Sequence, residues 1–250
     1  MNPLMIDTCT ICGLRVSRGS LQTHLAEIKR RAQHGEGAWL LTLNTEMLAR
    51  SVREPDYMRL MSTADVITAD GMPLVWASHF KADGGPIDGR TTGVDLVHAL
   101  LQSDDVPAFA IIGGKAPWVT VQAYGPRAVQ ACKYVFEDKV DLSEAQLSTF
   151  CMELAQREVK VVFIALGVPK QDHLASALRK RLPNLVLTGI GGSFEILSPG
   201  GGRAPAWMQR AGLEWFYRFG KEPARLWRRY LVSYPVGVWH LFKDCLVSRA

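Results

Sequence analysis

Apolar runs of strand length alternate with segments of helical period through most of this 250-residue chain. Short apolar runs are typical of strands buried on both faces, and apolar residues three and four apart are typical of helices that pack on a sheet. The alternation predicts an α/β fold, with a mostly parallel sheet flanked by helices on both faces. The predicted strands are 39–43, 65–68, 108–112, 159–166 and 185–190, and the predicted helices are 21–31, 73–80, 94–101, 118–131, 143–157 and 172–182.

The composition predicts a well-folded globular protein, because 48% of the residues are hydrophobic. The region after Met1 lacks the basic stretch and long apolar run of a secretory signal. The longest apolar stretches, 161–168 and 230–242, are shorter than the roughly 20 residues that span a bilayer, and Pro235 interrupts the second. Any contact with a membrane is therefore expected from one side only.

Five cysteines in a chain without a signal peptide predict reduced thiols. Cys9 and Cys12 have the spacing of a redox or zinc pair, but no second Cys/His pair lies nearby to complete a site. We therefore interpret this pair as structural.

Glycine-containing turns follow four of the predicted strands. Ligands of parallel sheets gather beyond the carboxyl ends of the strands, where turns open into helices. Glycines let a phosphate or a base approach the backbone, and the following helix supplies N–H donors. Together the turns predict a nucleotide-type site that includes Gly113, Gly114, Gly191 and Gly192. The turns are 69–73, 113–115, 167–171 and 189–194.

Missing motifs narrow the kind of site. Residues 41–46, after the first predicted strand, contain no glycine, so a Rossmann dinucleotide fingerprint is absent and NAD binding is disfavoured. No Walker motif occurs, which excludes a P-loop ATPase. The chain also lacks the Asp-x-Asp pair with which many sugar transferases hold a divalent ion, and its histidines have no metal-ligand spacing. We expect neither a metal ion nor a cofactor.

Four side chains at strand ends are candidates for chemistry. Asp70 follows the run 66–69 and can act as a general base, or it can simply cap the helix that begins near Pro73. Thr42 and Asn44 can bind a sugar or phosphate, or cap the helical pattern that follows at 46–52. Gln171 can contact a ligand or be only the first turn of its helix.

The segment 203–229 is basic and aromatic. Seven Lys or Arg residues face two acids there, so this segment accounts for the whole net charge of +5. Such a patch concentrates anions. Because the interleaved rings favour the membrane interface, we expect a lipid surface more than nucleic acid. The aromatic residues are Trp207, Trp215, Phe216, Tyr217, Phe219 and Trp227, with Tyr230 directly after the segment.

Motifs along nearly the full chain resemble, in order, those of the WecG/TagA/CpsF glycosyltransferases (glycosyltransferase family 26). The matching segments are 42–46, 69–71, 90–95, 113–115, 165–171, 191–194, 203–209 and 212–230.

The resemblance implies a Rossmann-like catalytic core over residues 1–198 and a C-terminal basic and aromatic helical, membrane-associating appendage over 199–250. It also implies an inverting, metal-independent transferase that moves a sugar from a UDP donor to a polyprenyl-diphosphate-linked saccharide. The expected sugars are N-acetylmannosamine, its uronic acid, glucuronic acid or glucose. Such enzymes are peripheral proteins of the cytoplasmic membrane face and build bacterial teichoic acid or exopolysaccharide.

The family's functional residues are carried over position by position. Asp70 matches the general base, Thr42 and Asn44 match the polar pocket residues, and Gln171 matches the glutamine of the G-x-P-K-Q turn. Arg90 lies in a matching segment and is expected to bind substrate. The appendage arginines of the family correspond to Arg218, Arg225 and Arg228.

Two other classes fit part of the pattern. A non-catalytic nucleotide-sugar or lipid-binding module would use the same turns, and a basic nucleic-acid-binding protein would use the same charges. Neither accounts for both the placement of Asp70 and the aromatic tail. The chain can also self-associate as a homo-oligomer, through apolar area beneath a detached tail.

Overall fold

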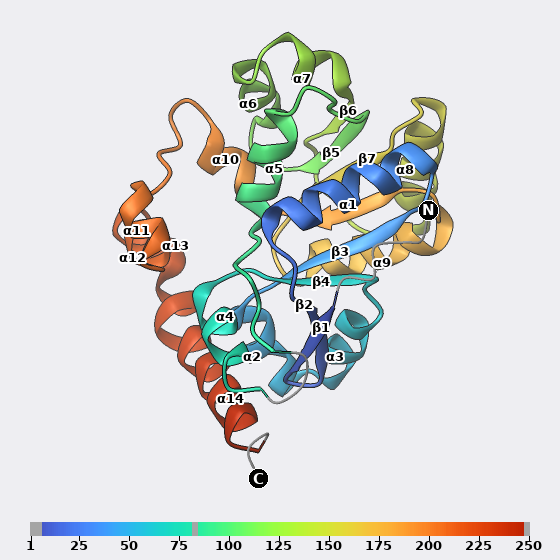
Figure 1. Ribbon diagram of the computed structural model, residues 1–250. Helices are drawn as coiled ribbons and strands as arrows, with labels where there is room; N and C mark the ends of the chain where they lie inside the picture. The colour runs from blue at the N-terminus through green and yellow to red at the C-terminus, as the bar shows by residue number, and fades with distance from the viewer. Residues whose placement is uncertain (1–6, 82–84, 248–250) are drawn as a thin grey trace.

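The computed structural model describes residues 7–81 and 85–247 and contains a six-stranded parallel sheet in the order β4-β3-β8-β7-β5-β6 (Figure 1). A separate antiparallel hairpin is formed by β1 and β2. The strands are β1 (Thr8–Ile11), β2 (Leu14–Ser17), β3 (Ala38–Leu43), β4 (Val66–Ala69), β5 (Phe109–Gly113), β6 (Cys132–Phe136), β7 (Val161–Ala165) and β8 (Val186–Gly189).

Helices cover both faces of the sheet, as the alternating pattern predicts. The helices of the first 200 residues are α1 (Leu21–His34), α2 (Thr45–Arg53), α3 (Pro55–Ser62), α4 (Met72–Ser78), α5 (Gly93–Leu101), α6 (Pro117–Ala123), α7 (Pro126–Ala131), α8 (Glu144–Gln156), α9 (Lys170–Arg181) and α10 (Ser193–Leu197). The C-terminal ones are α11 (Ala206–Arg210), α12 (Glu214–Lys221), α13 (Pro223–Trp227), a π-helical stretch η1 (Arg228–Ser233) and α14 (Tyr234–Val247).

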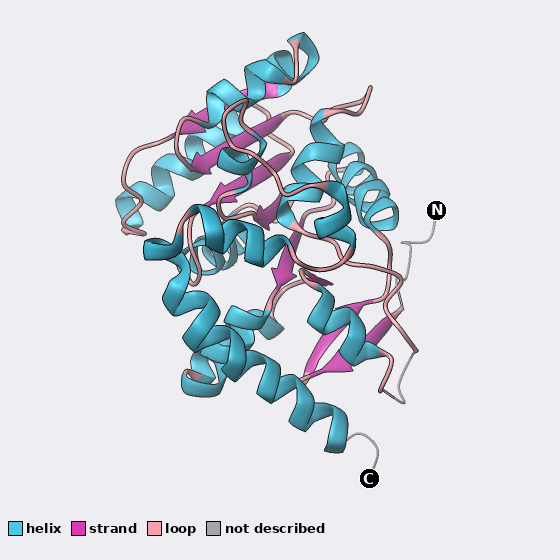
Figure 2. Cartoon of the chain, turned by 90° about the vertical axis from the view of Figure 1, so that its left-hand side faces the viewer, coloured by secondary structure: helices cyan, strands magenta, loops and turns pink. Residues whose placement is uncertain are grey.

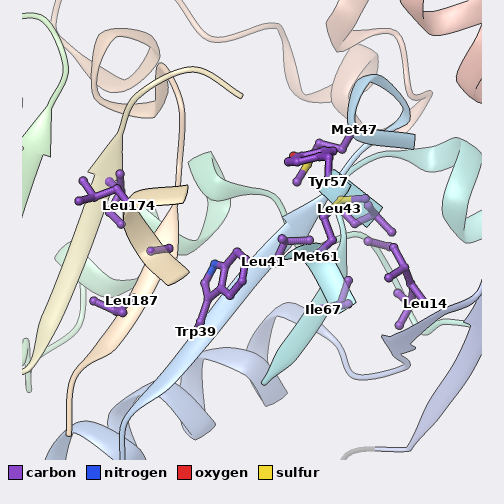
Figure 3. Packing of buried hydrophobic residues seen from close by; sticks show 14 of the residues in the cluster. Leu14, Trp39, Leu41, Leu43, Met47, Tyr57, Met61, Ile67, Leu174 and Leu187 are labelled. Carbon is purple, nitrogen blue, oxygen red and sulfur yellow. The ribbon is translucent and has the colours of Figure 1, made fainter. Parts of the chain in front are cut away.

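Alternate residues of the central strands enter two separate cores. In β5, Ala110 and Ile112 pack into the larger core with α8 and α9, whereas Phe109 and Ile111 pack into the second core with α1 and α5. Figure 3 shows part of the larger core around Trp39 of β3. This period of two explains why these strands appear in the sequence as continuous apolar runs.

All five predicted strands form, and the differences lie at the edges of the fold. The predicted helix 118–131 is two helices, because Gly125 has φ 91° and Pro126 begins a new helix. The edge strand β6 was not predicted, since its residues are only half-buried and form no apolar run. The short hairpin of β1 and β2 was also not predicted.

The hairpin contains the Cys9 and Cys12 pair. None of the five cysteines forms a disulfide in the described part of the chain, and both of these are buried. Burial raises the pKa of the Cys12 thiol to about 12, so its reactive thiolate form is disfavoured. The Cys12 N–H donates to Oδ2 of Asp244 in α14 at 2.7 Å, which joins the hairpin to the C-terminal helix.

The C-terminal helices run down one side of the molecule (Figures 1 and 2), and the last of them, α14, packs closely on α2. Gly237 makes this close packing possible, since a Cβ there would lie 2.0 Å from the carbonyl oxygen of Thr45. Farther along α14, the Asp244 carboxylate pairs with the buried Lys81 ammonium at 2.5 Å. None of the helices within 7–81 and 85–247 combines the length and apolar character needed to cross a bilayer.

The helical run from Pro223 to Val247 changes its winding at η1. Pro235 has no backbone N–H, so an α-helix through it would lose one hydrogen bond. The wider π-helical turn immediately before Pro235 relieves this conflict. As a result, Arg229 and Tyr230 face the body of the protein while Leu231 and Val232 are exposed.

We predict that Gly237→Ala destabilises the protein, because the added methyl group would press on the Thr45 carbonyl. The expected loss is about 2 kcal/mol in the free energy of unfolding, measured by urea denaturation. Gly220→Ala in α12 is the matched control, since no atom lies within 4 Å of its Cβ position. It should be neutral or stabilise by up to about 1 kcal/mol. Equal stability of the two variants would contradict the proposed close packing.

Candidate functional site

A cavity of about 690 Å³ lies between the carboxyl ends of four sheet strands and the C-terminal helices. Its wall on the sheet side comes from the turns after β4, β3, β8 and β7. Its other wall comes from residues 211–238. Eight of the predicted site residues line this cavity: Thr42, Asn44, Asp70, Arg90, Gln171, Gly191, Gly192 and Arg218.

Asp70 is placed by the backbone directly after β4. Its N–H donates to the Leu43 carbonyl at 2.7 Å, which continues the β3–β4 ladder by one residue. Gly71 then takes φ 133°, a conformation in which side-chain residues are strained, and α4 begins at Met72 without a side-chain cap. The alternative that Asp70 caps this helix is therefore wrong, and its half-buried carboxyl lines the cavity.

The electrostatic surroundings of Asp70 suit a base that works near neutrality. Burial raises the pKa of Asp70 to about 7, and the cations of Arg229 and Arg90 oppose this rise. The carboxylates of Asp95 and Glu214 raise the same pKa further. A carboxyl with such a pKa can both accept and release a proton near pH 7.

Two ion pairs cross between the core and the C-terminal helices at this cavity. Arg90 Nη2 lies 3.1 Å from Oε2 of Glu214 in α12, and both side chains are at least four-fifths buried. Arg229 Nε in η1 lies 2.9 Å from Oε2 of Glu46 in α2. All four side chains line the cavity, so each pair presents one arginine to a bound anion.

The loop that carries Arg90 is held beside Asp70. The Thr91 N–H donates to the Ala69 carbonyl at 2.8 Å, and Thr91 Oγ1 lies 2.9 Å from Nδ1 of the buried His24. Because Ala69 directly precedes Asp70, these contacts fix the guanidinium-bearing loop relative to the candidate base.

Thr42 and Asn44 line the cavity but also have structural tasks. The Thr42 hydroxyl donates to the Gly189 carbonyl at 3.1 Å. The Asn44 side chain accepts from the N–H groups of Glu46 and Met47 and thereby caps α2. The capping alternative for Asn44 is confirmed, and its remaining amide donors are the atoms left for a ligand.

Gln171 lies in the first turn of α9 and shapes the glycine turn after β8. Its Oε1 accepts from the Gly191 N–H at 3.1 Å. A Cβ at Gly189 would lie 2.7 Å from Gln171 Nε2, so this strand end must be glycine for the amide to fit. Gln171 therefore sets the position of the turn that carries Gly191 and Gly192.

Among the described residues, three predicted site residues do not line the cavity. Gly113 ends β5 and Gly114 follows it, and β5 lies beyond β7 and therefore away from the strand ends at the cavity. Their turn contributes indirectly, since the Lys115 N–H donates at 2.8 Å to the carboxylate of Glu195, which does line the cavity. Arg228 is exposed, with its guanidinium 5.3 Å from the Trp227 ring. The side chain of Arg225 lies outside the described part of the structure.

Several residues of the cavity had not been predicted. Among them are Glu214, which pairs with Arg90, and Glu46 and Arg229, which pair with each other. Tyr230 and Tyr234 form a cluster with Trp215, with ring centroids 5.6 Å apart between Trp215 and Tyr230 and 5.2 Å apart between the tyrosines. Arg229 directly follows the predicted Arg228, so the basic pattern pointed to this region without indicating which arginine faces inward.

No cluster of three or more His, Cys, Asp or Glu side chains arranged for a metal ion occurs among the described residues. Of the side chains that the structure describes, the cationic ones at the cavity are Arg90, Arg218 and Arg229.

Comparison with known proteins identifies relatives of the chain. Residues 9–250 match the model of the glycosyl transferase WecG/TagA/CpsF family. A relative from Bacillus spizizenii is 31% identical over 207 residues, covering 78% of this chain and 76% of the relative. One from Bacillus subtilis is 28% identical over 211 residues, covering 78% and 75%. Both are named N-acetylglucosaminyldiphosphoundecaprenol N-acetyl-beta-D-mannosaminyltransferase.

We predict that Asp70→Asn stabilises the protein at pH 8. Because the folded-state pKa is raised, the ionised carboxyl disfavours folding, and this penalty grows as pH rises from about 4 to about 7 and then levels. The free energy of unfolding should exceed that of wild type by about 2 kcal/mol at pH 8, since the carboxyl is only half-buried. Urea denaturation between pH 4 and 8 measures this difference, with Asp88→Asn as a control at an exposed aspartate. A difference that does not change with pH would contradict the prediction.

Proposed function

Because this chain belongs to the WecG/TagA/CpsF glycosyltransferase family, we propose that it transfers a sugar from a UDP donor to a saccharide on a polyprenyl diphosphate. We propose further that the transfer inverts the anomeric centre and needs no metal ion. The observation that carries this proposal is Asp70, a carboxyl with a pKa of about 7 in a cavity lined by arginines.

The proposed reaction is a single displacement. The Asp70 carboxylate takes the proton of an acceptor hydroxyl as the hydroxyl oxygen forms a bond to the anomeric carbon of the donor. The bond from that carbon to the UDP phosphate oxygen breaks at the same time, and its electron pair leaves with UDP. Attack from the face opposite UDP inverts the configuration. The reaction then needs one base and one group of cations for the departing diphosphate.

The cavity offers groups for that diphosphate without a metal ion. Arg90 and Arg218 present guanidinium groups, whose planar geometry binds phosphate oxygens in pairs. Charge that develops on the leaving phosphate is stabilised by such preorganised donors. The Gly191–Gly192 turn lets the diphosphate come close to the backbone.

The aromatic cluster supplies the remaining recognition surface. Trp215, Tyr230 and Tyr234 line the wall formed by the C-terminal helices, where flat rings can pack against a sugar or a uracil base. The relatives are named for transfer of N-acetylmannosamine to an N-acetylglucosaminyl diphosphoundecaprenol. UDP-N-acetylmannosamine and that acceptor are therefore the first pair to test.

We also propose that residues 1–198 form the catalytic core and that residues 199–250 bring it to the cytoplasmic membrane face. Tyr230 and Leu241 pack inward, while apolar side chains of α14 and the helices before it remain exposed. A helix that is apolar on both sides usually has both sides covered. The exposed large apolar residues of the described C-terminal helices and their connections are Trp207, Leu213, Trp215, Phe216, Trp227, Leu231, Val232, Val238, Trp239, Phe242 and Leu246.

The segment before these helices is anchored to the core. Arg203 forms an ion pair with Asp95 of α5, and Ala204 is buried. Gly201 passes so close to α10 that a Cβ would lie 1.9 Å from the Glu195 carbonyl oxygen. This loop therefore holds the C-terminal helices in place over the cavity.

We predict that wild-type protein releases UDP from UDP-N-acetylmannosamine only when a short-chain lipid-diphosphate-N-acetylglucosamine acceptor is present, and that EDTA does not abolish the release. Asp70→Asn should lower kcat by about 10²- to 10⁴-fold, because the carboxamide cannot take the hydroxyl proton. A coupled UDP assay with a panel of UDP-sugars measures both.

Two outcomes would contradict this function. Retention of full activity in Asp70→Asn would remove the carboxylate from the mechanism. Binding of UDP without release from any donor would favour a non-catalytic binding module. Because the same substitution is expected to raise stability at pH 8, a loss of activity in this variant is not explained by unfolding.

We predict that the double variant Trp239→Ser/Phe242→Ser binds anionic lipid vesicles at least tenfold more weakly than wild type. Both side chains are more than half exposed, and their transfer into the lipid interface is favourable. Vesicle co-sedimentation measures the binding. Trp118→Ser/Val119→Ser on α6 is the matched control, since it removes exposed apolar area outside the C-terminal helices. Equal weakening by both double variants would contradict a docking face on α14.

A further inference from the structure

Arg229 lines the cavity, and neither the sequence motifs nor the family resemblance assigned it a role. It lies in η1, lines the same cavity as Asp70 and contacts Glu46 of α2. It therefore belongs to the C-terminal helices, while both groups beside it belong to the core. Arg229 thus brings a cation from the C-terminal helices to the cavity of the candidate base.

The two acidic groups near Arg229 are held by the same strand end. The Asp70 N–H donates to the Leu43 carbonyl, the last residue of β3. The next residue, Asn44, caps α2 and so fixes Glu46 in the first turn of that helix. Asp70 and Glu46 thus have a common support, and the position of Arg229 relative to one is coupled to its position relative to the other.

The contact between Arg229 and Glu46 leaves the guanidinium only partly satisfied. The Nε atom lies 2.9 Å from Glu46 Oε2, but it is buried without a hydrogen bond of good geometry to any described residue. The Arg229 guanidinium is therefore not neutralised by a bidentate ion pair with Glu46, and its positive charge can act on other groups at the cavity.

Charged and titratable groups from five parts of the chain act on Asp70 or respond to it. Arg229 of η1 and Arg90 of the loop before α5 are the cations, and Arg229 lowers the pKa of Asp70 more than Arg90 does. Asp95 of α5 and Glu214 of α12 act in the opposite direction. Tyr234 of α14 also faces this region, and burial is the main reason that the pKa of its hydroxyl is raised.

Arg90 and Arg229 differ in whether their acidic partner also acts on Asp70. Arg90 already pairs with Glu214, whose carboxylate also acts on Asp70 and offsets part of the effect of Arg90. Glu46, the partner of Arg229, is not among the main groups that act on Asp70. Of these two arginines, Arg229 is therefore the one whose effect on the pKa of Asp70 is less offset by its acidic partner.

We propose that Arg229 is a positioning residue of the transfer reaction, which keeps Asp70 ionised and available as a base while the C-terminal helices are seated on the core. This inference rests on the proposed function for its catalytic meaning. The coupling between Arg229 and Asp70 is a property of the protein alone and can be measured without a substrate.

The direct test follows the Asp70 carboxyl by NMR in protein labelled with ¹³Cγ aspartate, with the resonance assigned by its absence in Asp70→Asn. In Arg229→Met the carboxyl should titrate about one pH unit or more above its wild-type value, because an opposing cation has been removed. Arg229→Lys should titrate close to wild type, since the charge is kept. Lys243→Met, which removes an exposed cation of α14, is the matched control and should leave the titration unchanged.

The kinetic test measures kcat/KM of the same variants against pH with the short-chain acceptor. If Asp70 must be ionised, Arg229→Met should lose about tenfold activity at pH 6 and less than twofold at pH 9. Arg229→Lys should restore the wild-type profile. Arg229→Met leaves Glu46 without its cation, so the double variant Glu46→Gln/Arg229→Met keeps the test valid if the single variant folds poorly. It should show the same upward shift.

The outcomes separate this inference from the proposed function. An Asp70 titration that is unchanged in both Arg229→Met and the double variant overturns the inference, whatever happens to activity. A higher KM at every pH without a shift of the profile also overturns it, because Arg229 would then act on substrate. A shifted titration in protein that transfers no sugar supports the coupling and contradicts the proposed function instead.

Discussion

The contact between α14 and α2 is the one on which the candidate site depends. Gly237 allows the two helix backbones to approach at Thr45, the residue that follows the Asn44 cap. Because α13, η1 and α14 form a continuous helical run, this contact also places Arg229 and Tyr230 at the cavity. One wall of the site therefore belongs to helices whose position depends on packing against α2.

The two walls of the cavity are supported in different ways. Asp70 and Gln171 follow strands and are held by backbone hydrogen bonds or short contacts to neighbouring strand ends. Residues of the C-terminal helices reach the core through ion pairs, such as Glu214 with Arg90. Backbone ladders hold a group with little freedom, whereas partly exposed ion pairs exchange more readily with an anionic ligand. This difference suits a site in which the base is fixed and the diphosphate contacts form when substrate binds.

The sequence predicted the sheet, its helices and the core side of the site, because buried strands appear as apolar runs and their carboxyl ends meet at one edge. Asp70, Gln171 and the Gly191–Gly192 turn follow directly from that rule. Strand order does not follow from it, and for this reason Gly113 and Gly114 were placed at a cavity from which β7 separates them. The winding of the helix decides that Arg229, and not Arg228, faces the cavity. This winding cannot be deduced from the composition of a basic segment.

The orientation of α14 relative to α13 depends more on the number of residues in the π-helical stretch before Pro235 than on which residues they are. A substitution within η1 alters one side chain. Removal of a single residue would turn all of α14 by about 100° relative to α13. Gly237 would then leave the surface of α2 and Leu241 would leave the larger core, and exposed side chains such as Trp239 would take their place. Homologous chains that keep this cavity should therefore tolerate varied residues at the exposed positions of η1, such as Leu231 and Val232, but not insertions or deletions.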